Sequence, residues 1–202
     1  MTWLILGLVL FLGAHSTRIF ADGWRTKTME AWGEKPFKGV IALASLLGLY
    51  GLIVGYAQVR MEPVVIWQPP IATRHISLLL MLFASILLVA AYVPANHFKV
   101  RLGHPMVLSV KVWALAHLLA NGNLADLVLF GTFLAWSVMN FKSARARDRA
   151  ITESQALVLD ESLQTTIPKT SATLIAVAVG AGLWALITFV LHAKVVGVSP
   201  MA

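Results

Sequence analysis

Two of the six histidines lie inside long apolar runs, and these two are the residues best suited to chemistry. His15 falls within the apolar run 2–20 and His117 within the run 105–121. An ionisable ring in hydrocarbon is costly and is by default a functional hypothesis. A neutral imidazole is also a common axial ligand of haem iron. We therefore interpret His15 and His117 as candidate metal ligands for haem, and the alternative is that each forms a hydrogen bond between helices.

Each of these histidines has a neighbour at helical spacing that could contact the same ligand. Arg18 follows His15 by three residues and shares its face of a helix, where a cation could pair with a haem propionate. Trp113 precedes His117 by four residues and could form a wall for a flat macrocycle. The alternatives are an arginine that extends to the membrane surface and a tryptophan that packs against another helix.

The composition indicates which elements must position these residues. Of the 202 residues, 58% are hydrophobic and 12% are charged, whereas a soluble domain has about 25% charged residues. A water-soluble globule is therefore excluded, and an all-α bundle of membrane-spanning helices is predicted. One span takes about 20 residues, and the apolar runs predict six spans in a single domain, residues 1–202. The predicted spans are 2–20, 37–57, 75–95, 105–121, 123–141 and 172–192.

The net charge of +7 is interpreted as a signal of orientation, not of nucleic-acid binding. Most of the 16 Lys and Arg residues lie in three predicted loops, at 18–38, 99–101 and 142–169. Because basic loops face the cytoplasm, both termini are predicted to be periplasmic. The polar stretch 142–171 is predicted to be a cytoplasmic loop, either a solvated linker with a short helix or a segment that docks a partner.

Short-range signals predict how some of these helices meet. Asn121-Gly122-Asn123 is a strong turn signal between the fourth and fifth spans. Asn123 is predicted to cap the next helix, with Asp126 in its first turn. Gly48, Gly51 and Gly55 share one face of the second span, which is typical of close helix packing, with room for a flat ligand as the alternative. Ala176 and Gly180 form a similar small face on the last span.

The chain has no cysteine, which excludes iron–sulfur clusters, thiolate ligation and covalent haem attachment through a C-x-x-C-H motif. It also has no H-E-x-x-H, P-loop, G-x-S-x-G or G-x-G-x-x-G motif. The sequence therefore contains none of these motifs for hydrolysis or phosphoryl transfer.

The pattern GHPMVLSVKVWALAHLLANGNLADLVLFGTFLAW, at 103–136, resembles the signature of the NnrU family. Further segments that resemble it are GAHSTRIF, GLIVGYAQVR, RHISLLLML and LHAKVVGV. The resemblance covers essentially the whole chain. It implies a bacterial inner-membrane protein associated with denitrification, that is, with the reduction of nitrite and nitric oxide, in which components of those reductases are candidate partners.

The chain more distantly resembles the zeta-carotene isomerase of plants and cyanobacteria, a membrane protein with b-type haem held by His and Cys. The motifs align its ligand histidines with His15 and with His117 of the pattern Trp113–His117, and its cysteine with Ala114. The resemblance implies a haem b protein with a redox or isomerase-like role. The lack of the cysteine argues against carotene isomerisation itself. The alternative function is a non-enzymatic membrane factor that supports assembly or expression of the reductases.

The predicted topology leaves the ligand pair open. His15 is predicted on the cytoplasmic side of the membrane midplane and His117 on the outer side, about 12 Å apart along the membrane normal. By depth alone, His75 is the better match for His117, and His104 for His15. The resemblance favours His15 with His117, and His75 and His104 remain the alternative ligands.

Overall fold

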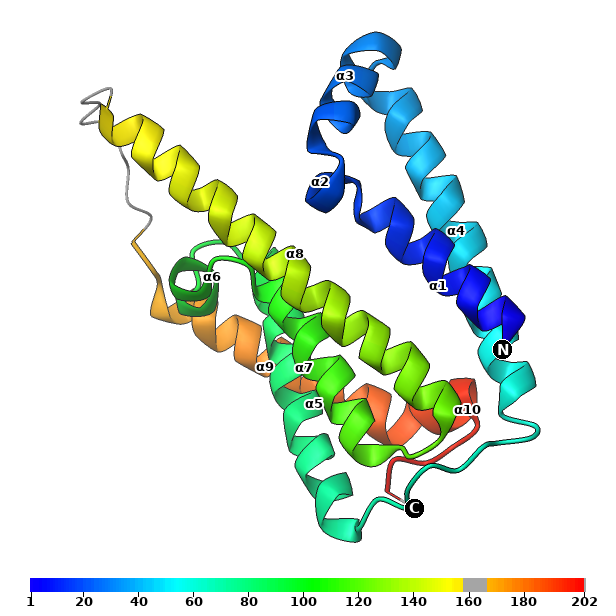
Figure 1. Ribbon diagram of the computed structural model, residues 1–202. Coiled ribbons are helices and arrows are strands. Elements are labelled where there is room, and N and C mark those ends of the chain that lie inside the picture. Colours follow the sequence, from blue (N-terminus) through cyan, green and yellow to red (C-terminus); the bar gives the residue numbers. More distant parts are fainter. Residues whose placement is uncertain (158–166, 202) are drawn as a thin grey trace. The chain divides into compact units, whose positions relative to one another are not determined.

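The computed structural model describes residues 1–157 and 167–201, and every regular element within these ranges is a helix (Figure 1). The predicted all-α fold is therefore confirmed. The elements in chain order are α1 (Thr2–His15), α2 (Thr17–Phe20), α3 (Asp22–Trp32), α4 (Glu34–Val59), α5 (Ile71–Tyr92), α6 (His97–Leu102), α7 (Pro105–Ala120), α8 (Leu124–Leu157), α9 (Thr170–Leu186), the π-helical segment η1 (Ile187–Leu191) and α10 (His192–Val196).

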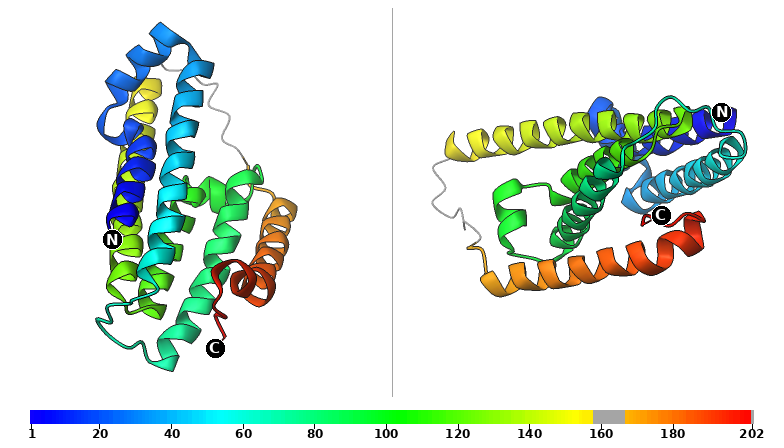
Figure 2. Two further views of the ribbon diagram at one scale, coloured as in Figure 1. Left: turned by 90° about the vertical axis from the view of Figure 1, so that its right-hand side faces the viewer. Right: turned by 90° about the horizontal axis from the view of Figure 1, so that it is seen from below.

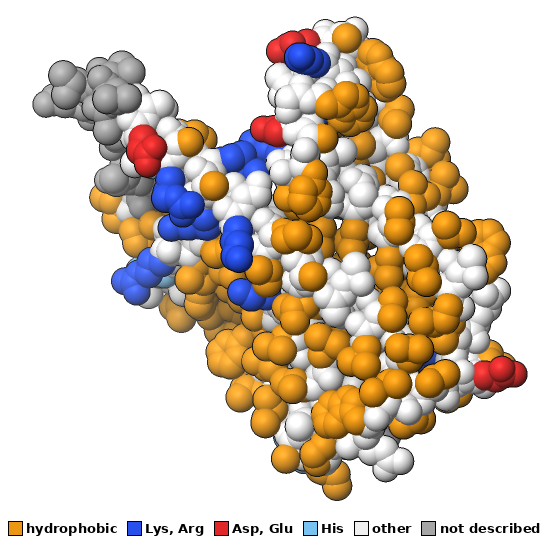
Figure 3. All heavy atoms as spheres, in the orientation of Figure 1, with side chains coloured by type: hydrophobic (Ala, Val, Ile, Leu, Met, Phe, Trp, Pro, Cys, Tyr) orange, Lys and Arg blue, Asp and Glu red, His pale blue; other side chains and the backbone are white. Residues whose placement is uncertain are grey.

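Four of these helices are long and apolar enough to cross a membrane: α4, α5, α8 and the continuous run from α9 to α10. Large apolar side chains on them stay exposed, among them Leu46 at 64% and Leu174 at 64%, and hydrophobic side chains cover much of the face in Figure 3. A soluble monomer rarely exposes continuous apolar surface of this kind. The chain is therefore an α-helical membrane protein.

The predicted count of six spans is not confirmed, because α1 and α7 are shorter than the expected spans. They have 14 and 16 residues, or about 21 and 24 Å at 1.5 Å per residue. A hydrocarbon core is about 30 Å thick. The predicted first span ends early because the helix is interrupted at Ser16, and α2 and α3 follow as separate short helices.

Helix α8 continues well beyond the predicted end of its span at residue 141. It has 34 residues and reaches Leu157, so the first half of the expected loop 142–171 is helical and belongs to α8, not to a separate short helix. The stretch 142–157 contains no Gly or Pro and is rich in Ala, Arg and other good helix formers. Residues 158–166 of the expected loop lie outside the described residues.

The chain divides into two compact units. The first comprises residues 1–68 and 121–140, and the second comprises residues 69–120 and 141–202. Within the first unit, α1 lies along α4 (Figure 2). A Cβ built on Gly48 would lie 2.5 Å from the backbone nitrogen of Phe11, and one on Gly51 would lie 3.1 Å from Gly7 Cα. The predicted close packing of the glycine face is confirmed, because only glycine lets the two backbones approach this closely.

The core of the first unit joins α1, α4 and the first turns of α8. Its buried members are Leu4, Leu8, Leu12, Leu52 and Ala125. The chain after α4 also pairs with the predicted turn 121–123, where the Ile66 and Trp67 amides donate to the Gly122 carbonyl. The predicted turn between α7 and α8 is therefore present, and it is held by a segment more than fifty residues earlier in the chain.

In the second unit, α5 packs against both α7 and α9. The Ser109 hydroxyl of α7 donates to the Ala84 carbonyl of α5 at 2.7 Å, and the Trp184 indole of α9 donates to the Leu78 carbonyl at 3.1 Å. A Cβ on Gly180 would lie 2.6 Å from Ile86 Cα, so the predicted small face on the last span also packs closely. Helix α9 then passes through the π-helical turn η1 into α10.

Candidate functional site

His15 is the last residue of α1, and its ring is held in one orientation by the helix that carries it. Its Nδ1 lies 2.7 Å from the Phe11 carbonyl oxygen, four residues earlier. Because a carbonyl only accepts hydrogen bonds, Nδ1 is the donor, and in the neutral ring Nε2 then carries the lone pair. The ring packs on Phe11 at a centroid distance of 4.5 Å and meets the edge of Trp136 at 6.4 Å. His15 is exposed, so a ligand can reach Nε2.

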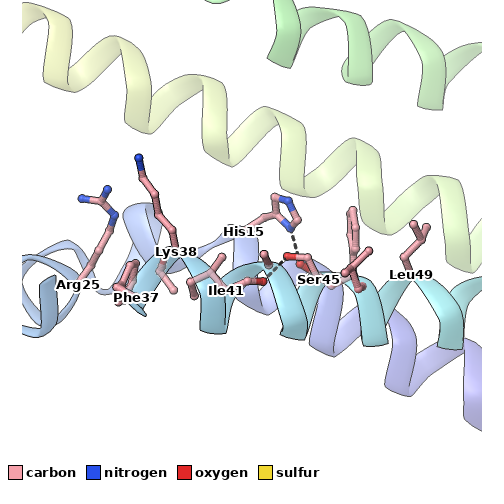
Figure 4. A pocket seen from close by; sticks show the side chains of 11 residues that line it. His15, Arg25, Phe37, Lys38, Ile41, Ser45 and Leu49 are labelled. Atoms are coloured by element: carbon pink, nitrogen blue, oxygen red, sulfur yellow. Dashed lines mark hydrogen bonds between the residues drawn. The ribbon is translucent and has the colours of Figure 1, made fainter. Parts of the chain in front are cut away.

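A hollow of about 560 Å³ lies beside His15 and belongs entirely to the first unit. This volume is within the range of small-molecule sites. Its walls are mostly aliphatic and aromatic, with five polar or charged side chains among them (Figure 4). The lining residues come from α1 to α4: Phe11, His15, Thr17, Arg25, Phe37, Lys38, Ile41, Ala42, Ser45, Leu46 and Leu49.

The charge in this hollow comes from Arg25 and Lys38. The Arg25 guanidinium lies 6.0 Å from the centroid of the Phe37 ring, and the Lys38 ammonium pairs with Glu34 at 2.5 Å. Arg18, which the sequence analysis proposed as the propionate partner, is exposed and does not line the hollow. The hollow beside His15 is thus lined by two other cations, Arg25 and Lys38, and its surface is mostly apolar.

His117 lies in the second unit, and its ring is held in the same manner. Its Nδ1 lies 2.9 Å from the Trp113 carbonyl oxygen, so Nδ1 is again the donor. The predicted neighbour Trp113 is in place, with its ring centroid 5.1 Å from that of His117. Ala114, the position at which the resemblance implies a cysteine in the carotene isomerases, is fully buried. His15 and His117 belong to different units, so their pairing as ligands stays a prediction.

The alternative ligands differ from these two in their surroundings. His104 Nε2 lies 2.9 Å from the Asp148 carboxylate, and Asp148 also lies 3.6 Å from Arg145. His104 is therefore part of a hydrogen-bonded polar group that joins the start of α7 to α8. His75 is exposed in the first turns of α5. Across residues 1–157 and 167–201, no three His, Asp or Glu side chains come together in a way that could hold a metal ion.

A buried carboxyl group, Asp126, forms a polar centre that the sequence analysis identified only in part. Asp126 is 1% exposed, and its Oδ2 accepts from the backbone N–H and the side-chain amide of Asn123 at 3.2 and 3.0 Å. This confirms its predicted place at the start of the helix. Its Oδ1 also accepts a hydrogen bond of 2.5 Å from the Tyr56 hydroxyl of α4. No local pattern predicts that bond, because 70 residues separate the two.

Sequence reasoning also missed Trp136, Arg25 and Lys38. Trp136 Nε1 donates to the Ser16 hydroxyl at 3.1 Å and so ties the end of α1 to α8. From the sequence, Arg25 and Lys38 serve only as markers of orientation. A signal was present, because an amphipathic stretch with Trp24, Trp32 and several charges separates the first two apolar runs, and such a segment is typical of an interfacial helix.

The model of the NnrU protein family matches residues 3–200, which is nearly the whole chain. The chain belongs to the NnrU family. No curated protein and no solved structure gives a significant match. The family membership and the four long apolar helices agree in describing an NnrU-family protein of the membrane, in which His15 and His117 occupy two of the segments that carried the resemblance.

Proposed function

We propose that this NnrU-family protein binds b-type haem through His15 and His117 and uses it in a redox or isomerase-like role. The observation that carries the proposal is the shared state of the two imidazoles. In each, Nδ1 donates to the carbonyl of the residue four positions earlier. In a neutral ring this places the lone pair on Nε2, the nitrogen that would bind iron, and a hydrogen bond to the other ring nitrogen is the usual means of orienting a metal-bound histidine.

The surroundings of both histidines fit a flat apolar group. His15 is flanked by Phe11 and Trp136 beside a mostly apolar hollow, and His117 is flanked by Trp113. Aromatic and aliphatic side chains exclude water and provide the contact area that a porphyrin needs. Bound haem would supply one-electron transfer or recognition of a small ligand such as nitric oxide.

A carotene-isomerase activity like that of the distant relatives is not part of this proposal. Those relatives hold iron with a cysteine as well as histidines, and the aligned position here is Ala114. An alanine methyl cannot ligate iron, and the position is fully buried. An exchange of ligands between histidine and thiolate is therefore impossible in this chain.

The proposed cellular setting is the bacterial inner membrane, with both termini periplasmic. It is supported by the concentration of Lys and Arg in three of the segments between the apolar runs. The proposed connection with nitrite and nitric oxide reduction is supported by family membership. Deletion of the protein is expected to lower nitric oxide reduction in whole cells while the reductase polypeptides are still made.

The ligand proposal is tested by a visible spectrum of the full-length protein, purified in detergent from haem-replete cells. We expect a Soret band, with sharp α and β bands on reduction. His15→Ala and His117→Ala should each shift or abolish these bands. His192→Ala is a stringent control because its Nδ1 also donates to a carbonyl, that of Val198 at 2.6 Å, and it should leave the spectrum unchanged.

Two results would contradict the proposal. Protein purified without haem, which also fails to bind added haemin, would favour the non-enzymatic assembly factor. The second result is a spectrum that is unchanged in His15→Ala and His117→Ala but lost in His75→Ala or His104→Ala. It would identify His75 or His104 as the iron ligand instead.

A further inference from the structure

The end of the hollow beside His15 carries the two cations Arg25 and Lys38 next to an apolar wall. Figure 4 shows the side chains of Arg25, Lys38 and His15 extending toward the same side of α4. The wall between them is formed by Phe37, Ile41 and other apolar residues of α4. Two positive charges beside an apolar surface match a ligand with an apolar body and acidic groups along one edge.

One of these two cations, Lys38, is already paired with a carboxylate of the protein itself. Glu34 pairs with Lys38 at 2.5 Å, and both side chains are more than half exposed, at 62% and 66%. Glu34 also lies within electrostatic reach of Arg25. Lys38 is thus placed where a carboxylate can contact it, and Glu34, held only by an exposed pair, can be displaced at small cost.

We infer that Arg25 and Lys38 form a carboxylate-binding site for an amphiphilic ligand and that this ligand's carboxylates are the haem propionates. The inference uses the proposed function only for the identity of the ligand. Arg25 presents a planar fork of donors that suits a carboxylate, and its guanidinium lies 6.0 Å from the centroid of the Phe37 ring, at the outer limit of a cation–π contact. Lys38 provides a point charge. Arg18, outside the hollow, has no part in this site.

The expected effects are moderate because the site is open to solvent. An exposed pair contributes up to about 1 kcal/mol, so the loss of either cation should weaken binding about fivefold. Glu34→Gln should have the opposite effect, because it removes the carboxylate that competes for Lys38. An increase of about twofold to fivefold in affinity is expected for that variant.

The test is titration of haem-free, full-length protein in detergent with two probes, haemin and its dimethyl ester. The ester has the same ring and iron but no propionate charge. Arg25→Gln and Lys38→Gln should weaken haemin binding about fivefold and leave ester binding unchanged. Lys27→Gln and Lys35→Gln are matched controls on α3 and α4, because neither residue lines the hollow. They should affect neither probe.

The outcomes of these titrations show whether the carboxylate site, the haem proposal or both are wrong. Haemin binding that depends on His15 but is unchanged in Arg25→Gln and Lys38→Gln would overturn the site and leave the haem proposal standing. If haemin does not bind, a fluorescent long-chain fatty acid is the second probe. Fatty-acid binding that is weakened by Arg25→Gln and Lys38→Gln would retain the carboxylate site but refute haem as its ligand. Binding of neither probe would refute both.

Discussion

Replacement of Tyr56 by phenylalanine should destabilise the protein through the loss of a single oxygen atom. The Tyr56 hydroxyl donates to Asp126 Oδ1 at 2.5 Å, while Oδ2 accepts from two nitrogens of Asn123. Both carboxyl oxygens thus act as acceptors, which is the arrangement expected of an ionised group. Asp126 is 1% exposed, so water cannot replace the lost donor without opening the contact between α4 and α8.

The size of the effect follows from this geometry. A hydrogen bond to a charged group contributes about 1.5–3 kcal/mol, and a buried acceptor that loses a donor retains most of its desolvation penalty. We therefore expect Tyr56→Phe to lower the free energy of unfolding by about 2 kcal/mol. For a chain of this length that corresponds to a decrease in melting temperature of about 4–8 °C.

The assay is thermal unfolding in detergent, followed by circular dichroism at the helical band. Tyr50→Phe is the matched control because Tyr50 lies on the same helix and is 65% exposed. Its melting temperature should change by no more than about 2 °C. A double-mutant cycle of Tyr56→Phe with Asp126→Asn should give a coupling free energy of about 1–2 kcal/mol. Equal melting temperatures for the two phenylalanine variants, or additive effects in the cycle, would refute the assigned bond.

Four further variants, one of them a control, test close packing and buried hydrogen bonds by the same melting assay. Gly48→Ala should destabilise strongly, because its methyl would meet the backbone of α1 at 2.5 Å, whereas Gly39→Ala, with open space around it, should be neutral or slightly stabilising. Ser109→Ala should cost about 1 kcal/mol through the lost bond to α5, and no change in its melting temperature would contradict that bond. Asn96→Ala should cost about 2–4 kcal/mol, since this fully buried side chain makes three hydrogen bonds around the start of α6. A loss below 1 kcal/mol would show that water replaces them.

Local sequence patterns predict the structural features that depend only on residues close together in the chain. The turn at Gly122, the place of Asp126 at the start of α8 and the close approach of helices at Gly48 all depend on residue types within a few positions. The same is true of Trp113 beside His117, because four residues in a helix return to the same face. Each of these predictions is confirmed.

Features that depend on distant partners were not predictable in this way. The partner of Asp126 is Tyr56, and the ring edge beside His15 belongs to Trp136; neither pair shares a local pattern. Arg18 as a propionate partner stays a prediction, although it does not line the hollow. Its spacing places it on the same face as His15 only if the helix continues, and the helix is interrupted at Ser16.

Helix α8 extends beyond the predicted span because polarity indicates the end of a membrane span and not the end of a helix. The residues after 141 are charged, but they are also good helix formers without Gly or Pro. Hydropathy marks where a helix can lie in lipid, whereas backbone propensity decides where it ends. The two boundaries coincide only when a breaking residue stands at the membrane surface.

The π-helical turn Ile187–Leu191 gives the last helix an extra residue without breaking it. One residue in an α-helix corresponds to a rotation of roughly 100°, so His192 and all that follows face a different direction than the register of α9 alone would give. Such turns are commonly the trace of a single-residue insertion. A relative lacking one residue here would keep an unbroken helix and turn its C-terminal segment by roughly 100° relative to the segment in this chain.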